Sequence, residues 1–90
     1  MRLRGRVDAN QAEIVTALRA CGRRVLLLSA IGKGCPDLLV GWPGNNVLIE
    51  VKTADGVLTP DQVAFFNTWT GPKAVVRTVA EALEATGIRK

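Results

Sequence analysis

The sequence predicts an α/β fold in which a mixed β-sheet is flanked by helices. Three observations favour this class. An apolar stripe with helical spacing runs through residues 8–21. Two short apolar stretches then enclose the turn sequence WPGNN, which is typical of a β-hairpin. Two threonine-led capping sequences open later helices, with one more apolar stretch between them.

Each element has a local reason. The first helix is expected over residues 8–21, with Asp8 as its N-cap and Gly22 as its stop. Thr59-Pro60 should open the second helix and Thr78 the third. The apolar stretches between turn residues have the length of strands. They are residues 24–30, 37–41, 47–52 and 73–77.

The predicted order is therefore αβββαβα. Ninety residues leave room for one hydrophobic core, so residues 1–90 are expected to form a single domain. No apolar run approaches the ~20 residues of a membrane span, and no apolar segment of a secretory signal follows the basic start. Cys21 and Cys35 lack metal-ligand spacing and are expected to be buried thiols rather than a disulfide.

The predicted hairpin brings charged residues together. If the turn centres on Pro43-Gly44, the numbers of cross-strand partners sum to about 87, and Asp37 lies opposite Glu50. Lys52 shares their face because strand side chains alternate. Facing carboxylates repel, most strongly when partly buried. A divalent cation between them would remove this repulsion, and oxygen ligands suit Mg²⁺ or Mn²⁺.

These residues also carry a family resemblance. Pro36-Asp37, twelve intervening residues and Glu50-Val51-Lys52 resemble the signature of the PD-(D/E)xK nuclease superfamily. The chain is similar to the VRR-NUC branch, especially to its small stand-alone members from bacterial viruses. The supporting stretches are DANQAEIV, GKGCPDLLVG, VLIEVK, LTPDQ and Trp69-Thr70-Gly71, which together span roughly residues 8–84. The segment TADGV after Lys52 departs from the pattern, since more basic residues are expected there.

The resemblance implies a restriction-endonuclease-like αβββαβ core and a metal-dependent DNA endonuclease. The cofactor would be Mg²⁺ or Mn²⁺, and the substrate would be branched DNA such as Holliday junctions or flaps. It also implies a homodimer, located in the cytoplasm of a bacterial host cell. Phe65, Phe66 and Trp69 are more than one helix face can bury, so some of them are expected at the subunit interface.

The same resemblance assigns roles at the centre. Asp37 and Glu50 would bind the metal together with the backbone carbonyl of Val51. Lys52 would orient or activate the attacking water and balance charge at the phosphate.

Two further residues are expected in the catalytic centre on this ground. Glu13 matches the family's helix carboxylate, which binds metal directly or through water, and Gln62 matches a glutamine near the catalytic lysine. Each also has a structural alternative: Glu13 as a solvated helix residue, and Gln62 as part of the helix cap. Lys33, between two glycines, is either a loop charge or a phosphate contact.

The charge distribution leaves two interpretations open. Residues 1–35 carry seven basic side chains against two acidic ones, while residues 36–70 carry four acidic side chains against one lysine. A basic half is typical of a nucleic-acid partner, but also of an ordinary solvated surface. The alternative to an enzyme is a non-catalytic nucleic-acid-binding module with a nuclease-like fold, or an interaction domain with no nucleic-acid role.

Overall fold

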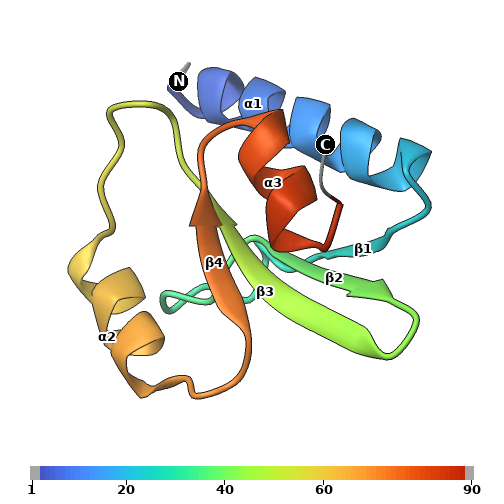
Figure 1. Cartoon of the computed structure of the whole chain (residues 1–90). Coiled ribbons are helices and arrows are strands. Elements are labelled where there is room, and N and C mark those ends of the chain that lie inside the picture. Colours follow the sequence, from blue (N-terminus) through green and yellow to red (C-terminus); the bar gives the residue numbers. More distant parts are fainter. Residues whose placement is uncertain (1–2, 89–90) are drawn as a thin grey trace.

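A computed structural model describes residues 3–88 of the chain (Figure 1). The element order αβββαβα is confirmed. The elements are α1 (Leu3–Ala20), β1 (Arg24–Leu27), β2 (Leu38–Trp42), β3 (Asn45–Val51), α2 (Pro60–Thr68), β4 (Lys73–Val76) and α3 (Val79–Ala85). The four strands lie in the order β1-β2-β3-β4, with antiparallel pairs between the first three strands and a parallel β3–β4 pair. The sheet is therefore mixed, as predicted.

The first helix is longer than predicted. It begins at Leu3, so Asp8 lies inside the helix and its assignment as N-cap was wrong. Leu and Arg are good helix formers, and they extend the helix upstream of the capping signal. The stop at Gly22 is confirmed: its φ is +84°, its N–H donates to the Arg19 carbonyl, and the N–H of Arg23 donates to the Leu18 carbonyl. These two bonds form a Schellman cap.

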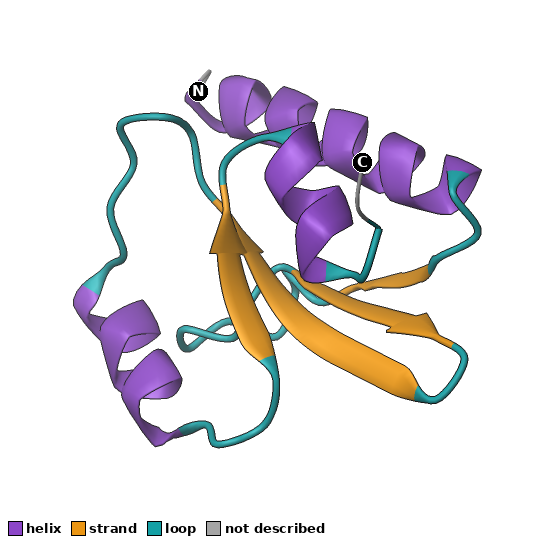
Figure 2. Cartoon of the chain, in the orientation of Figure 1, coloured by secondary structure: helices purple, strands orange, loops and turns teal. Residues whose placement is uncertain are grey.

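The hairpin has the predicted register. Leu38 pairs with Ile49 and Trp42 with Asn45, so the turn consists of Pro43 and Gly44. β1 ends at Leu27 rather than at residue 30, because its partner β2 begins only at Leu38 and the chain turns away between them. The two longest connections, residues 28–37 and 52–59, contain no helix or strand (Figure 2).

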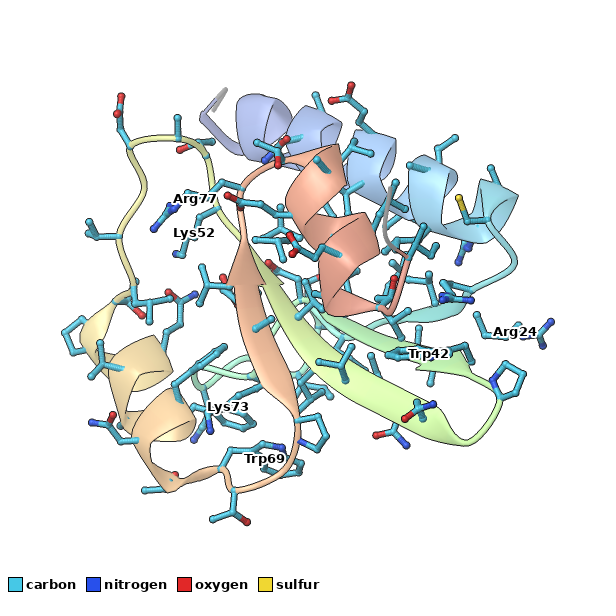
Figure 3. The ribbon with its side chains drawn as sticks, in the orientation of Figure 1. Arg24, Trp42, Lys52, Trp69, Lys73 and Arg77 are labelled. Atoms are coloured by element: carbon cyan, nitrogen blue, oxygen red, sulfur yellow. The ribbon has the colours of Figure 1, made fainter. Side chains whose placement is uncertain are left out.

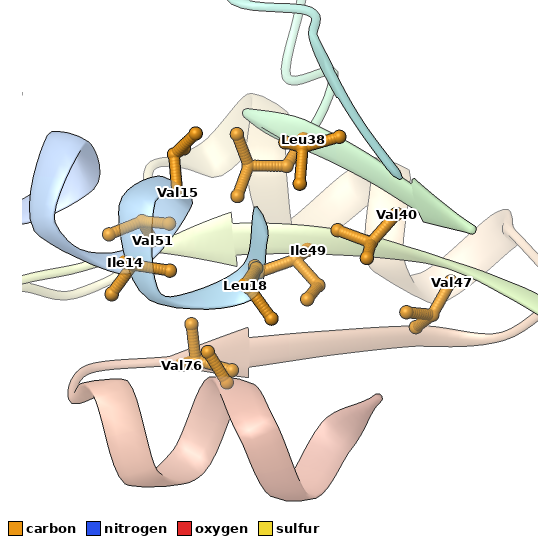
Figure 4. Packing of buried hydrophobic residues seen from close by; sticks show 11 residues of the cluster. Ile14, Val15, Leu18, Leu38, Val40, Val47, Ile49, Val51 and Val76 are labelled. Atoms are coloured by element: carbon orange, nitrogen blue, oxygen red, sulfur yellow. The ribbon is translucent and has the colours of Figure 1, made fainter. Parts of the chain in front are cut away.

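The core lies on one face of the sheet. Figure 1 shows α1 and α3 on this side and α2 on the other. Close packing of α1 against the strands is visible in Figure 4. The buried apolar side chains shown there include Ile14, Val15, Leu18, Leu38, Val40, Val47, Ile49, Val51 and Val76. In β2 and β3 these residues alternate with Leu39, Leu48 and Glu50, so the Glu50 carboxylate lies on the opposite face of the sheet.

The two later helices begin at their predicted caps. Thr59 and Gln62 form a complete capping box at α2. At α3 only half of the predicted box forms: Thr78 accepts from the Glu81 N–H, but the Glu81 side chain accepts from the N–H of Arg77 (2.7 Å). Since β4 is an edge strand, this N–H needs a partner other than a neighbouring strand.

Two remaining expectations concern thiols and membranes. Both cysteines are free, but Cys21 is exposed and Cys35 half-buried, so the prediction of buried thiols was wrong for Cys21. Cys21 caps the end of α1 instead of continuing its apolar stripe into the core. Among residues 3–88, no helix has the length and apolar character needed to cross a membrane.

Candidate functional site

The site is built on the face of the sheet that α1 and α3 leave uncovered. The observed strand pairing begins with Leu38 and Ile49, and Asp37 and Glu50 are the next residues on either side of it. The two carboxyl groups lie close together, because Asp37 accepts a hydrogen bond from the N–H that follows Glu50 and each acid shifts the pKa of the other. Glu50 is 2% exposed, and Asp37 is half-buried. The structure therefore brings together the two carboxylates that the sequence predicted to face each other.

The proline before Asp37 changes the hydrogen bonding of the strand pair. Continuing the same register sets Pro36 opposite Val51. Proline has no N–H, so it cannot donate to the Val51 carbonyl as another residue would. The Val51 N–H donates to Oδ2 of Asp37 at 2.9 Å instead of joining the ladder. Pro36 and Asp37 thus interrupt the hydrogen-bond ladder beside the Val51 carbonyl, which the family resemblance predicts to be a metal ligand.

Glu50 has one engaged oxygen and one free oxygen. Oε2 accepts a hydrogen bond from Gln62 Nε2 at 3.0 Å and lies 3.7 Å from Lys52 Nζ. Oε1 is buried and has no hydrogen-bond partner among the described residues. An unpaired buried carboxylate oxygen is costly, so it indicates a position where a proton, a water or a cation would be stabilised.

Burial perturbs both acids of the pair. Desolvation, followed by the charge of Asp37, raises the pKa of Glu50 to about 7, although Lys52 acts in the opposite direction. Desolvation also raises the pKa of Asp37, and the hydrogen bond from the Val51 N–H only partly offsets this. Glu50 is therefore close to the midpoint between its protonated and ionised forms near neutral pH.

The Gln62 side chain completes the helix cap and also contacts Glu50. Its Oε1 accepts from the Thr59 N–H at 2.9 Å, which completes the capping box, while its Nε2 donates to Glu50. A carboxamide carries an acceptor and a donor on one carbon, so the two contacts are compatible. The two interpretations were not exclusive.

The loop before Asp37 holds α2 near the carboxylates. Gly34 has a φ of +80°, and a Cβ at this position would lie 2.3 Å from the Asp61 carbonyl oxygen. Only glycine fits this close approach to the start of α2. The neighbouring Lys33 is exposed and itself has a positive φ of 56°. Its side chain is available to solvent, which is compatible with either predicted role.

Glu13 does not join the carboxylate pair in the structure. It is exposed on α1, whose buried face packs on the opposite side of the sheet. Within residues 3–88, no three His, Cys, Asp or Glu side chains gather as a metal-binding group. α1 brings the Asn10 side chain to this region, where its Nδ2 donates to the Lys52 carbonyl at 3.1 Å.

Sequence reasoning overlooked Cys35 as a neighbour of the site. Burial and the charges of Asp37 and Glu50 raise the pKa of its thiol. Its place two residues before Asp37 was the available signal, but no motif drew attention to it.

Comparison with known proteins adds no assignment. No family model, no curated protein and no solved structure matches this chain. The functional argument therefore depends on the residues and geometry of the site.

Proposed function

We propose that this protein is a divalent-metal-dependent DNA endonuclease that hydrolyses phosphodiester bonds. The observation that carries the proposal is the close pair formed by half-buried Asp37 and buried Glu50, with Lys52 at its side. Two neighbouring carboxylates repel each other and destabilise a sheet, so a chemical role accounts for the pair better than a structural one. The resemblance to the PD-(D/E)xK signature supplies the reaction class.

The donor set fits Mg²⁺ or Mn²⁺. Glu50 offers an unpartnered buried oxygen, Asp37 offers the oxygen that Val51 does not use, and Pro36 cannot donate to the Val51 carbonyl. Hard oxygen donors of this kind suit small divalent cations. We assign the cation to Asp37, Glu50 and the Val51 carbonyl. Glu13 lies apart from this set in the structure, so its predicted role as a ligand, directly or through water, stays a prediction.

The remaining side chains have separate tasks. When bound, the cation supplies Lewis-acid polarisation of the phosphate and activation of water. Lys52 contributes a positive charge beside Glu50, where it can stabilise charge that develops on the phosphate oxygens. Gln62 fixes Oε2 of Glu50 and leaves Oε1 free. Water adds to phosphorus and gives up a proton to solvent, the bond from phosphorus to the leaving oxygen breaks, and that oxygen takes a proton from solvent to leave as a hydroxyl group.

The proposal also covers the fold family, the DNA substrate and the oligomeric state. We assign the αβββαβ order to a restriction-endonuclease-like core, branched DNA as the substrate, and a homodimer as the active form. The apolar side chains of Leu26 (59% exposed) and Leu27 (57%) on edge strand β1 support a self-associating surface. In the aromatic set of α2, Phe65 and Trp69 stack on each other at 5.3 Å, and Trp69 is 44% exposed.

A non-catalytic nucleic-acid-binding module is the second candidate. The observation that favours it is that, in the described part of the chain, no third acidic or thiol side chain completes a metal group around Asp37 and Glu50. The deciding experiment incubates the protein with duplex, flap and four-way-junction DNA in Mg²⁺, Mn²⁺ or EDTA. Cleavage that requires metal and disappears in Asp37→Ala supports the enzyme. Mobility shifts in EDTA without cleavage in either metal would replace it with the binding module.

A further inference from the structure

A turn held by an arginine follows directly after Lys52. The Gly56 N–H donates to the Thr53 carbonyl at 3.1 Å, which closes the turn. Arg77, the residue after β4, donates from Nη1 to the carbonyls of both Thr53 (2.8 Å) and Gly56 (2.7 Å). Figure 3 shows the Arg77 and Lys52 side chains in the same region, beyond the ends of β4 and β3. One guanidinium therefore fixes both ends of the turn.

This turn lies against the aliphatic part of Lys52. A Cβ built on Gly56 would be 3.4 Å from Cδ of Lys52 and 3.2 Å from Oγ1 of Thr53. The backbone of Gly56 thus lies beside the lysine side chain. An added methyl group would press on the Thr53 hydroxyl and come into contact with the Lys52 stem. The Lys52 side chain is only 15% exposed, although lysine side chains usually extend into water.

The backbone of Lys52 is also held. Its N–H donates to the Val76 carbonyl at 3.0 Å, and its carbonyl accepts from Asn10 Nδ2 at 3.1 Å. Main chain and side chain of the lysine are therefore fixed by different elements. A free lysine would occupy many rotamers, and ordering it has an entropic cost that must be offset by its surroundings.

We propose that Arg77 is a positioning residue that acts through the Thr53–Gly56 turn to direct the Lys52 ammonium group toward Glu50 and the phosphate. The inference rests on the proposed function, because it assigns a partner to the lysine of that same site. It also explains why Arg77, which lies outside the motif, donates hydrogen bonds to two loop carbonyls. Both hydrogen bonds come from one nitrogen, Nη1, and the flexible stem of a lysine would hold an ammonium group at that point less firmly than the planar guanidinium does.

The test compares three variants with a matched control. Arg77→Met removes both hydrogen bonds, Arg77→Lys keeps the charge, and Gly56→Ala crowds Lys52 without removing any bond. The control is Arg23→Met, because Arg23 likewise donates to a loop carbonyl, that of Thr86 at the end of α3, and lies outside the site. Unfolding is followed for each variant, so that activity is expressed per folded molecule.

The first readout is independent of catalysis. The chain has four lysines, so ¹³C labelling of lysine gives few Cε signals, and Lys52→Met identifies the one of interest. In the wild type we expect two resolved Hε shifts for Lys52. In Arg77→Met and Gly56→Ala they should converge on the single shift of an exposed lysine, with partial recovery in Arg77→Lys and no change in Arg23→Met.

The second readout is cleavage of branched DNA. Misplacement of a catalytic group lowers kcat by about ten- to a hundredfold, and we expect this for Arg77→Met with KM for DNA within about twofold of the wild type. An unchanged Lys52 signal in folded Arg77→Met, or an equal change in Arg23→Met, would overturn the inference. If Arg77→Met does not fold, Gly56→Ala decides by the same criteria. If the wild type cleaves no DNA, the proposed function fails, and the Lys52 signals alone still decide the positioning role.

Discussion

Glu50 should make this protein less stable as the pH rises through neutrality. Folding raises its pKa from 4.5 to about 7, so between these values the folded state binds more protons than the unfolded state. The contribution of Glu50 to stability is therefore fully present below about pH 4.5 and is lost as the pH rises to about 7. At about 1.4 kcal/mol per pKa unit, the full loss is about 3 kcal/mol, a large fraction of the stability of a small domain.

Urea unfolding at pH 5 and pH 8 in EDTA measures this loss. Glu50→Gln removes the titrating group, keeps the shape and should abolish most of the pH dependence, so the variant is more stable than the wild type at pH 8. Glu84→Gln, at an exposed position, is the control and should retain the wild-type profile. Saturating Mg²⁺ should restore wild-type stability at pH 8, because the cation favours the ionised pair. Equal stability of the wild type at the two pH values, or an equal loss in Glu50→Gln, would refute the reasoning.

Four further outcomes are expected. Lys52→Met should lower cleavage at least about a hundredfold while DNA binding in EDTA persists; wild-type turnover would end its catalytic assignment. Glu50→Ala should abolish Mn²⁺ binding in calorimetry, and retained affinity would remove Glu50 from the ligand set. Gly34→Ala should cost more than about 2 kcal/mol in urea unfolding, whereas Gly32→Ala, with a similar φ but open space, should cost about 1 kcal/mol; equal losses would contradict the steric argument. Light scattering should give twice the chain mass of 9.6 kDa, and Leu26→Glu should give a monomer; a monomeric wild type would exclude the dimer.

The sequence predicted those features that depend on local rules. The Pro43-Gly44 turn set the hairpin register, and period-two alternation then placed Asp37 and Glu50 on the face away from the core. The start of α1 and the end of β1 were missed, since both depend on how far neighbouring segments continue. A single capping residue cannot exclude helix upstream of it, and an apolar run cannot reveal where its partner strand begins.

The same distinction between features set by local sequence and features set by long-range contacts applies to the site. Asp37, Glu50 and Lys52 came from motif spacing, and all three are brought together. Whether Glu13 faces the site depends on how α1 is rotated about its own axis where it packs on the sheet. The spacing of residues along the helix does not determine that rotation. The contact of Arg77 with the turn after Lys52 joins residues more than twenty positions apart. The parallel pairing of β3 with β4 brings Arg77 to this turn, and nothing in the local sequence predicts that pairing.

The attachment of α2 depends on polar contacts rather than on a core. None of its residues is buried, yet it lies beside the carboxylates. Its described hydrogen bonds to other elements include Gln62 to Glu50 and Lys73 to the Trp69 carbonyl, and the backbone of Asp61 meets Gly34. The bond to Glu50 is strongest when that carboxylate is ionised. Protonation of Glu50 should therefore weaken the hydrogen bond from Gln62, which is one of the contacts that attach α2 to the sheet.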